Sequence, residues 1–65
     1  MLTHDEVEKA VIGAYMKPEG VHLPVAEEHL TRVRGWVVGE TLRQGWTYTT
    51  RYDRTHALLH VTVAL

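Results

Sequence analysis

Apolar residues near the start of the chain recur at helical spacing. The positions on this face are Val7, Ala10, Val11, Ala14 and Tyr15. Just before them, Thr3 and Glu6 have the spacing of a capping box, which satisfies two free amides at the start of a helix. Pro18 cannot continue a helix, because its ring removes the amide proton and fixes φ. The pattern therefore predicts a first helix over residues 4–16, followed by a turn in which Gly20 takes positive φ.

The middle of the chain carries two stripes of residues at helical spacing. Pro24 suits the first position of a second helix, and Gly45 suits its end. The first stripe comprises Ala26, Leu30, Val33 and Val37. The second lies on nearly the opposite side of the same helix and comprises Thr31, Gly35, Val38 and Leu42. A helix on the surface of a monomer needs only one apolar face, so the second stripe indicates a partner.

Gly35 and Gly39 leave an alternative open for this segment. Each glycine inside a helix costs about 1 kcal/mol relative to alanine. If the helix ended near Arg34, residues 36–42 would form a strand and the rest of the chain a three-stranded meander. We favour the long helix, because both stripes keep helical steps through this segment.

The last third of the chain alternates as β-strands do. The alternation over residues 46–52 and 55–65 predicts two antiparallel strands joined at residues 53–54. A two-residue turn and a four-residue loop centred on this pair give the same register, and the Asp-Arg pair favours the loop. In this register Tyr48 lies opposite Leu59 on the core face. The predicted second strand is longer than the first, so residues 62–65 have no partner within the chain. An apolar strand end without a partner favours pairing with another chain.

These elements predict an α+β fold for a single domain over residues 1–65. Two N-terminal helices are followed by a C-terminal antiparallel β-hairpin, and dimerisation completes the structure. The expected dimer interface comprises Gly35, Trp36, Val38, Leu42, Val63 and Leu65. The alternative is a monomer whose C-terminus frays.

Length and composition restrict the chemistry. A chain of 65 residues buries only about 60% of its unfolded surface, so its stability is marginal without a staple or a partner. The sequence contains neither cysteine nor serine, which excludes disulfides, thiolate zinc sites and the nucleophiles of serine and cysteine hydrolases. No phosphate-binding loop is present, and the chain is short for a substrate pocket. We therefore expect a non-catalytic protein without a cofactor.

The sequence also bears on location and metal binding. No uninterrupted apolar run exceeds three residues, and residues 1–5 lack the pattern of a secretory signal, so we expect a cytoplasmic protein without membrane contact. His56 and His60 have the spacing of a metal pair on a helix. On a strand, however, that spacing is about 13 Å, which is too long for one ion. We therefore predict no metal site.

Charge is distributed unevenly and suggests a second possible function. Residues 1–29 hold six carboxylates against two lysines, a net charge of −4, whereas residues 30–65 hold five arginines against two carboxylates, a net charge of +3. Cationic side chains gather on the outer face of the predicted hairpin and at its start. They are Arg43, Arg51, Arg54, His56 and His60. Two helices followed by such a hairpin resemble a reduced winged helix, which implies contact with nucleic acid.

The surplus of apolar surface favours a different primary function. We expect a small non-catalytic regulatory or adaptor protein that acts through protein–protein contacts, both with a second copy of itself and with another protein. Trp36 is the expected anchor, because tryptophan is enriched among residues that dominate interfaces. Nucleic-acid binding by the hairpin is the alternative, and the slightly acidic net charge of −1 argues against it.

Overall fold

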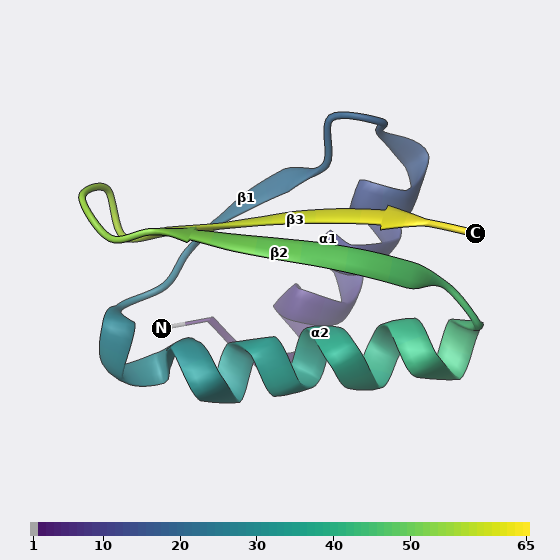
Figure 1. The fold of residues 1–65 in the computed structure, drawn as a ribbon. Coiled ribbons are helices and arrows are strands. Elements are labelled where there is room, and N and C mark those ends of the chain that lie inside the picture. The colour runs from purple at the N-terminus through teal and green to yellow at the C-terminus, as the bar shows by residue number, and fades with distance from the viewer. Residues whose placement is uncertain (1) are drawn as a thin grey trace.

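A computed structural model describes residues 2–65; Met1, the first residue of the segment read above for a secretory signal, lies outside the described residues. In chain order the elements are α1 (His4–Met16), β1 (Val21–Pro24), the short 3-10 helix η1 (Glu27–His29), α2 (Leu30–Gln44), β2 (Thr47–Asp53) and β3 (Leu58–Ala64). The α+β class is therefore confirmed, and the fold has one strand more than the predicted hairpin (Figure 1).

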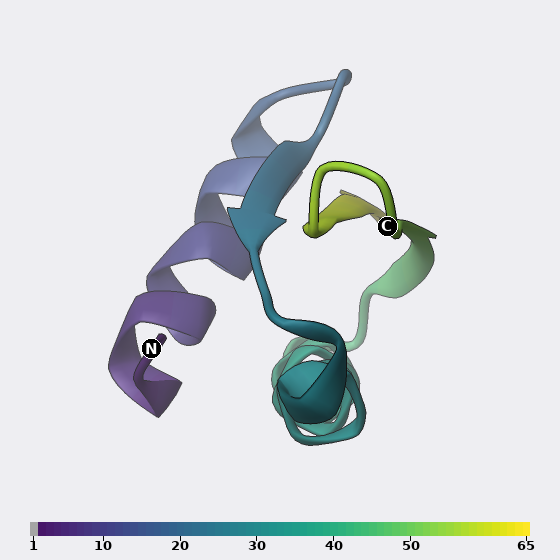
Figure 2. The ribbon, with the colours of Figure 1, turned by 90° about the vertical axis from the view of Figure 1, so that its left-hand side faces the viewer.

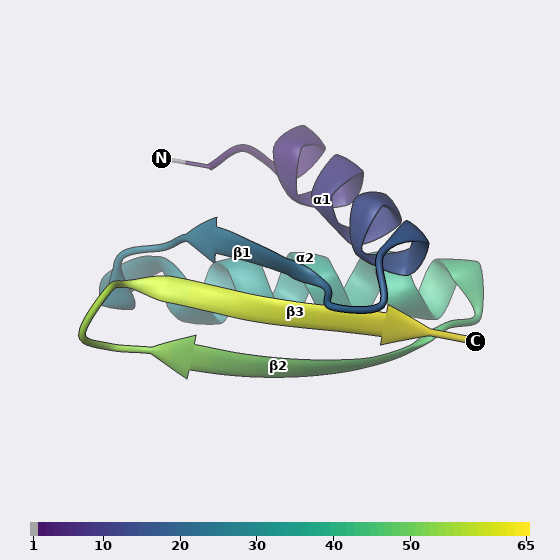
Figure 3. The ribbon, with the colours of Figure 1, turned by 90° about the horizontal axis from the view of Figure 1, so that it is seen from above.

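The three strands form an antiparallel sheet in the order β1-β3-β2. The last strand of the chain thus lies in the middle of the sheet (Figure 3). Both helices pack on the same face, with α1 towards β1 and α2 towards β2 (Figure 2). The core lies between this helical layer and the sheet. Its buried members are Val7, Val11, Leu23, Val25, Val33, Val37, Leu59 and Val61.

The first helix is confirmed over the predicted residues. The Thr3 hydroxyl accepts a hydrogen bond from the Glu6 amide, and the Glu6 carboxylate accepts one from the Thr3 amide. These bonds lower the pKa of Glu6, with the backbone bond from Thr3 as the largest cause. Gly20 takes a φ of 78°, as the turn requires. A Cβ at this position would run into the backbone oxygen of Val61, so β1 begins directly against β3.

The predicted start of the second helix at Pro24 is wrong. Pro24 ends β1 instead, and the α-helix begins only at Leu30 after the η1 turn. The reason is tertiary, because Val21 and Leu23 pair with Val61 and Leu59 and bring their side chains to the core face of the sheet. A proline is tolerated there because β1 is an edge strand. Ala26, expected on the core stripe, is consequently exposed and lies outside the helix.

The rest of the second helix agrees with the favoured interpretation. The helix continues through residues 36–42, so the alternative strand is wrong. Gly45 ends the helix with a φ of 76°, in the left-handed conformation that glycine adopts without strain. Thr41, buried in the last turns, donates its hydroxyl to the carbonyl oxygens of Val37 and Val38.

The hairpin is correct in its faces and wrong in its register. Tyr48 pairs with Val63 rather than Leu59, a shift of four positions along β3. The loop spans residues 54–57, which has the favoured length of four residues but lies two positions later than predicted; Ala57 holds a φ of 52° there. Because four is even, every side chain stays on its predicted face. Residues 62–64 are paired with 49–47, so the unpaired strand end predicted for this segment does not exist.

Within residues 2–65, no helix combines the length and the apolar character that crossing a bilayer demands.

Candidate functional site

The face of the sheet that points away from the helices is uncovered (Figures 2 and 3). We call it the outer face. Its residues are His22, Pro24, Thr47, Thr49, Arg51, Asp53, Leu58, His60, Thr62 and Ala64. None of these side chains is fully buried, and those on the two edge strands are exposed. The alternation of core and solvent positions along each strand creates this surface.

A row of three nitrogen-bearing side chains crosses the outer face. His60 of β3 lies between His22 of β1 and Arg51 of β2 in the strand register. The two imidazole rings stack in parallel planes, 6° apart in orientation, with their centroids 4.3 Å apart. The Nε2 atom of His60 lies 2.8 Å from the backbone oxygen of Glu19. The three side chains line a hollow of about 480 Å³.

Three of the five cationic residues proposed for nucleic-acid contact are held by carboxylates of the same chain. Arg43 contacts Glu40 and Glu8, Arg54 Nε lies 3.0 Å from Glu27 Oε2, and His56 Nδ1 lies 2.8 Å from Asp53 Oδ2. Only Arg51 and His60 lie together on the outer face without such a partner. The structure adds His22 to them, a residue that the sequence analysis did not assign to this surface.

The pair of Arg43 and Glu40 lies in the last turns of α2, with the Glu40 side chain buried and the Arg43 side chain exposed. Glu40 is 4% exposed and accepts hydrogen bonds from Arg43 and from Gln44. The bond from Gln44 and the guanidinium of Arg43 lower the pKa of Glu40, and the Glu40 carboxylate in turn raises the pKa of Arg43. Arg43 therefore compensates a buried charge and is not available as a free cation.

Asp53 organises the loop between β2 and β3. Its Oδ1 accepts from the amides of Thr55 and His56, at 3.0 and 3.3 Å. Hydrogen bonding by the His56 side chain is the largest cause that lowers the pKa of Asp53. The His56 ring is consequently held at the loop by Asp53 and is not part of the row formed by His22, His60 and Arg51.

The residues expected at a dimer interface lie in several places. Gly35, Val38 and Leu42 share the side of α2 opposite the core, and Leu42 is 72% exposed. Trp36 is half-buried, packs against the core and lies 5.3 Å from His4, ring centroid to ring centroid. Val63 is half-buried on the core face of β3, and Leu65 follows that strand.

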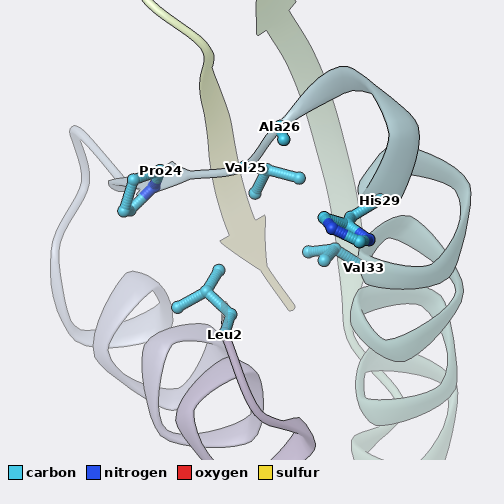
Figure 4. Close-up of a pocket in the computed structure, with 6 residues that line it drawn as sticks. All are labelled: Leu2, Pro24, Val25, Ala26, His29 and Val33. Atoms are coloured by element: carbon cyan, nitrogen blue, oxygen red, sulfur yellow. The ribbon is translucent and has the colours of Figure 1, made fainter.

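A second hollow, of about 220 Å³, opens between the start of α1 and the start of α2 (Figure 4). Its lining is mostly apolar and comprises Leu2, Pro24, Val25, Ala26, His29 and Val33. The side chain of Leu2 reaches towards it from the segment before α1, and that of Val33 from α2 (Figure 4). The hollow is smaller than the sites that hold drug-sized ligands, which start at about 300 Å³.

One long strand edge is also free. β2 has a hydrogen-bonded neighbour on one side only, and no helix or strand of residues 2–65 lies along its other side (Figure 3). The sequence analysis placed the strand segment available for pairing at residues 62–65 instead, because its hairpin register was wrong. The alternation of residues 46–52 was nevertheless visible as a strand pattern.

No group of three or more histidine and carboxylate side chains with the geometry of a metal site is present among residues 2–65. Comparison of the chain with known protein families, with curated proteins and with solved structures found no match.

Proposed function

We propose that this chain is a small non-catalytic regulatory or adaptor module that acts through protein–protein contacts, and that it forms a homodimer through β2. The observation that carries the proposal is the free edge of β2. An edge strand exposes a row of backbone amides and carbonyls that can hydrogen-bond to another strand. Pairing of this kind is a common mode of protein recognition, and main-chain hydrogen bonds supply much of its affinity.

The β2 edge carries two charged residues, Arg51 and Asp53, but lacks several other features by which proteins protect an edge. Its seven residues contain no proline and no lysine, and β2 pairs with β3 residue for residue without a bulge. Five of the seven residues are exposed and the other two are partly buried. Threonine, tyrosine and arginine make up six of the seven positions. Threonine and tyrosine favour strands, so the segment is suited to a central as well as an edge position.

The sequence of β2 is compatible with pairing to a second copy of itself. If two copies pair antiparallel about Thr50, all seven residues find partners. Tyr48 then lies opposite Tyr52 of the partner subunit, which gives two aromatic cross-strand pairs per dimer. Thr49 lies opposite Arg51 of the partner subunit, and Thr47 lies opposite its Asp53. No like charges face each other in this register.

Nucleic-acid binding has less support. Of the cations on and around the hairpin, Arg43, Arg54 and His56 are paired with carboxylates of the chain. A polyanion needs several free cations along its path, because each phosphate contact contributes through the release of a counterion.

Two lysine substitutions on β2 test the dimer. Thr49→Lys places a cation opposite Arg51 of the partner subunit at two symmetric positions. We expect this change to raise the dimer dissociation constant about tenfold, because each like-charge pair costs about 0.2–1 kcal/mol. Thr47→Lys is the matched control on the same strand and face. It places the cation opposite an aspartate, so the dissociation constant should fall.

Sedimentation equilibrium at low salt measures both constants, and urea unfolding checks that the subunits remain folded. A wild-type chain that stays monomeric at millimolar concentration would contradict the proposal. So would equal weakening by the two lysines, since that result would show that charge at this edge is unrelated to register.

A further inference from the structure

The row across the outer face brings three nitrogen-bearing side chains to one place. The register of the sheet fixes His22, His60 and Arg51 side by side, each on a different strand. The imidazole rings are 4.3 Å apart, and all three side chains line the same hollow. The positions rest on strand backbone rather than on a loop, so the three groups keep their mutual arrangement.

The contact of His60 fixes which of its nitrogens carries a proton. The backbone oxygen of Glu19 can only accept a hydrogen bond, and His60 Nε2 lies 2.8 Å from it. Nε2 is therefore protonated in the neutral ring, and Nδ1 is the atom that takes up a second proton. With both rings protonated, the row carries three positive charges, two of them on stacked rings that repel each other.

The carboxylates nearest to the row are engaged elsewhere. Asp53 shares its face of β2 and lines the same hollow, but its carboxylate accepts from the amides of Thr55 and His56 and from the His56 ring. Glu19 meets the row through its backbone oxygen. Within residues 2–65, no carboxylate oxygen lies within 4.0 Å of a side-chain nitrogen of His22, His60 or Arg51. Arg54 lines the same hollow and is itself paired with Glu27.

From this juxtaposition we infer a binding site for a compact dianion, a phosphate group in the form of inorganic phosphate or a phosphate monoester, held by His22, His60 and Arg51. An arginine guanidinium donates two parallel hydrogen bonds to such a group, and each protonated ring donates one more. The hollow of about 480 Å³ has room for a phosphate and for part of the molecule that carries it. Because two of the three ligating groups are histidines, which gain positive charge on protonation, binding strengthens at lower pH.

A compact dianion, which carries both charges on one group, suits this site better than a nucleic-acid strand. On the hairpin the basic side chains without a carboxylate partner, Arg51 and His60, lie next to each other, whereas Arg54 and His56 are paired with Glu27 and Asp53. A strand of phosphodiesters carries single charges spread along its length and gains little from one cluster. The site does not depend on the dimer proposed above, since it is complete within one subunit.

Titration with inorganic phosphate and with sulfate, followed by the ring resonances of the five histidines in NMR spectra, tests the inference. Sulfate keeps its two charges between pH 5 and 8, so the pH dependence of its binding reports on the protein alone. We expect sulfate to bind at least tenfold more tightly at pH 5.5 than at pH 8, with shifts confined to His22 and His60. Arg51→Gln and His22→Gln should each weaken binding of both anions at least tenfold at pH 5.5.

His56→Gln is the matched control, because this histidine belongs to the same hairpin and is paired with Asp53. It should leave both affinities unchanged, and circular dichroism should show all three variants folded. Equal sulfate binding at pH 5.5 and pH 8 would overturn the inference, as would an equal loss in His56→Gln. Binding of an oligothymidylate through the same residues at lower concentration than phosphate would also overturn it and would assign the row to nucleic acid.

Discussion

The two edge strands of the sheet, β1 and β2, differ in how well they are protected against pairing with another strand. β1 has four residues, begins immediately after Gly20 and ends at Pro24. β2 has seven residues and neither a glycine nor a proline within it. The short edge offers little backbone to another strand, and its proline has no amide to donate. The backbone of β1 therefore protects one edge of the sheet, whereas the edge of β2 stays available for pairing with another strand.

The exit of β1 is also tied to the hairpin. The Val25 amide donates to the Ala57 carbonyl at 2.9 Å, and the Tyr52 hydroxyl donates to the Val25 carbonyl at 2.6 Å. Both polar groups of this buried residue are therefore satisfied. At the start of β2, Thr47 has one comparable side-chain bond, from its hydroxyl to the Ala64 carbonyl at 3.2 Å.

Replacing Gly20, at the start of the β1 edge, should have the largest effect on the free energy of unfolding. In Gly20→Ala the new Cβ meets the Val61 carbonyl, and alanine is strained at a φ of 78°. We expect a loss of about 2–4 kcal/mol in the free energy of unfolding, measured by urea denaturation. Gly39→Ala is the control, because a Cβ there meets nothing within 4 Å and alanine favours the helix. It should gain about 1 kcal/mol. Equal effects of the two changes would mean that β1 does not dock as described.

Removing the hydrogen bond between Tyr52 of β2 and Val25, which follows β1, should have a smaller effect on the free energy of unfolding. Tyr52→Phe keeps the ring and deletes the hydroxyl that donates to Val25. The free energy of unfolding should fall by about 1 kcal/mol, the usual net value of one such bond. Hydrogen exchange of the Val25 amide should quicken at the same time. Unchanged exchange would show that the other bond, to Ala57, holds this segment alone.

Replacing Asp53, the last residue of β2, should have the smallest effect on the free energy of unfolding, and this effect should depend on pH. The pKa of Asp53 is lower in the folded protein than its ordinary value of 3.8, so its ionised form stabilises the fold. That contribution is complete above the ordinary value and disappears as the pH falls through the lower, folded value. Asp53→Asn should therefore be less stable than the wild type at pH 7, and the difference should shrink in urea unfolding near pH 3. A difference that persists at pH 3 would assign the effect to packing rather than charge.

The parts of the fold that the sequence predicts correctly depend on local interactions. The capping box, the first helix and the glycine that ends α2 all involve residues within a few positions of one another. The faces of β2 and β3 were also predictable, because the alternation of side chains does not depend on register.

The errors have tertiary causes. β1 is only four residues long and ends at a proline, so its hydrophobic pattern is weaker than the helical signal of Pro24 and the following acids. The hairpin register depends on a loop in which Ala57 occupies the left-handed region. That conformation favours glycine or asparagine, and an alanine therefore gives no sign of it.

The candidate site was partly visible in the sequence. Arg51 and His60 were correctly placed on one outer face. The pairing of Arg54 with Glu27 joins residues 27 positions apart in the chain, and no local pattern indicates it. His22 could have been assigned to the outer face only after β1 had been identified as a strand. The predicted dimer interface stays a prediction, and the β2 edge adds a different surface to it.

The position of β3 has a consequence for how the chain folds during its synthesis. Translation proceeds from the N-terminus, so β1 and β2 leave the ribosome before the strand that must lie between them. Neither can form a ladder of hydrogen bonds until Leu58 and the residues after it have emerged, and Val21 must then find Val61 forty positions away. Contacts so distant in the chain slow folding. A nascent chain that pauses before this point exposes two unpaired strands and the apolar sides of its helices, which is the kind of surface that chaperones bind.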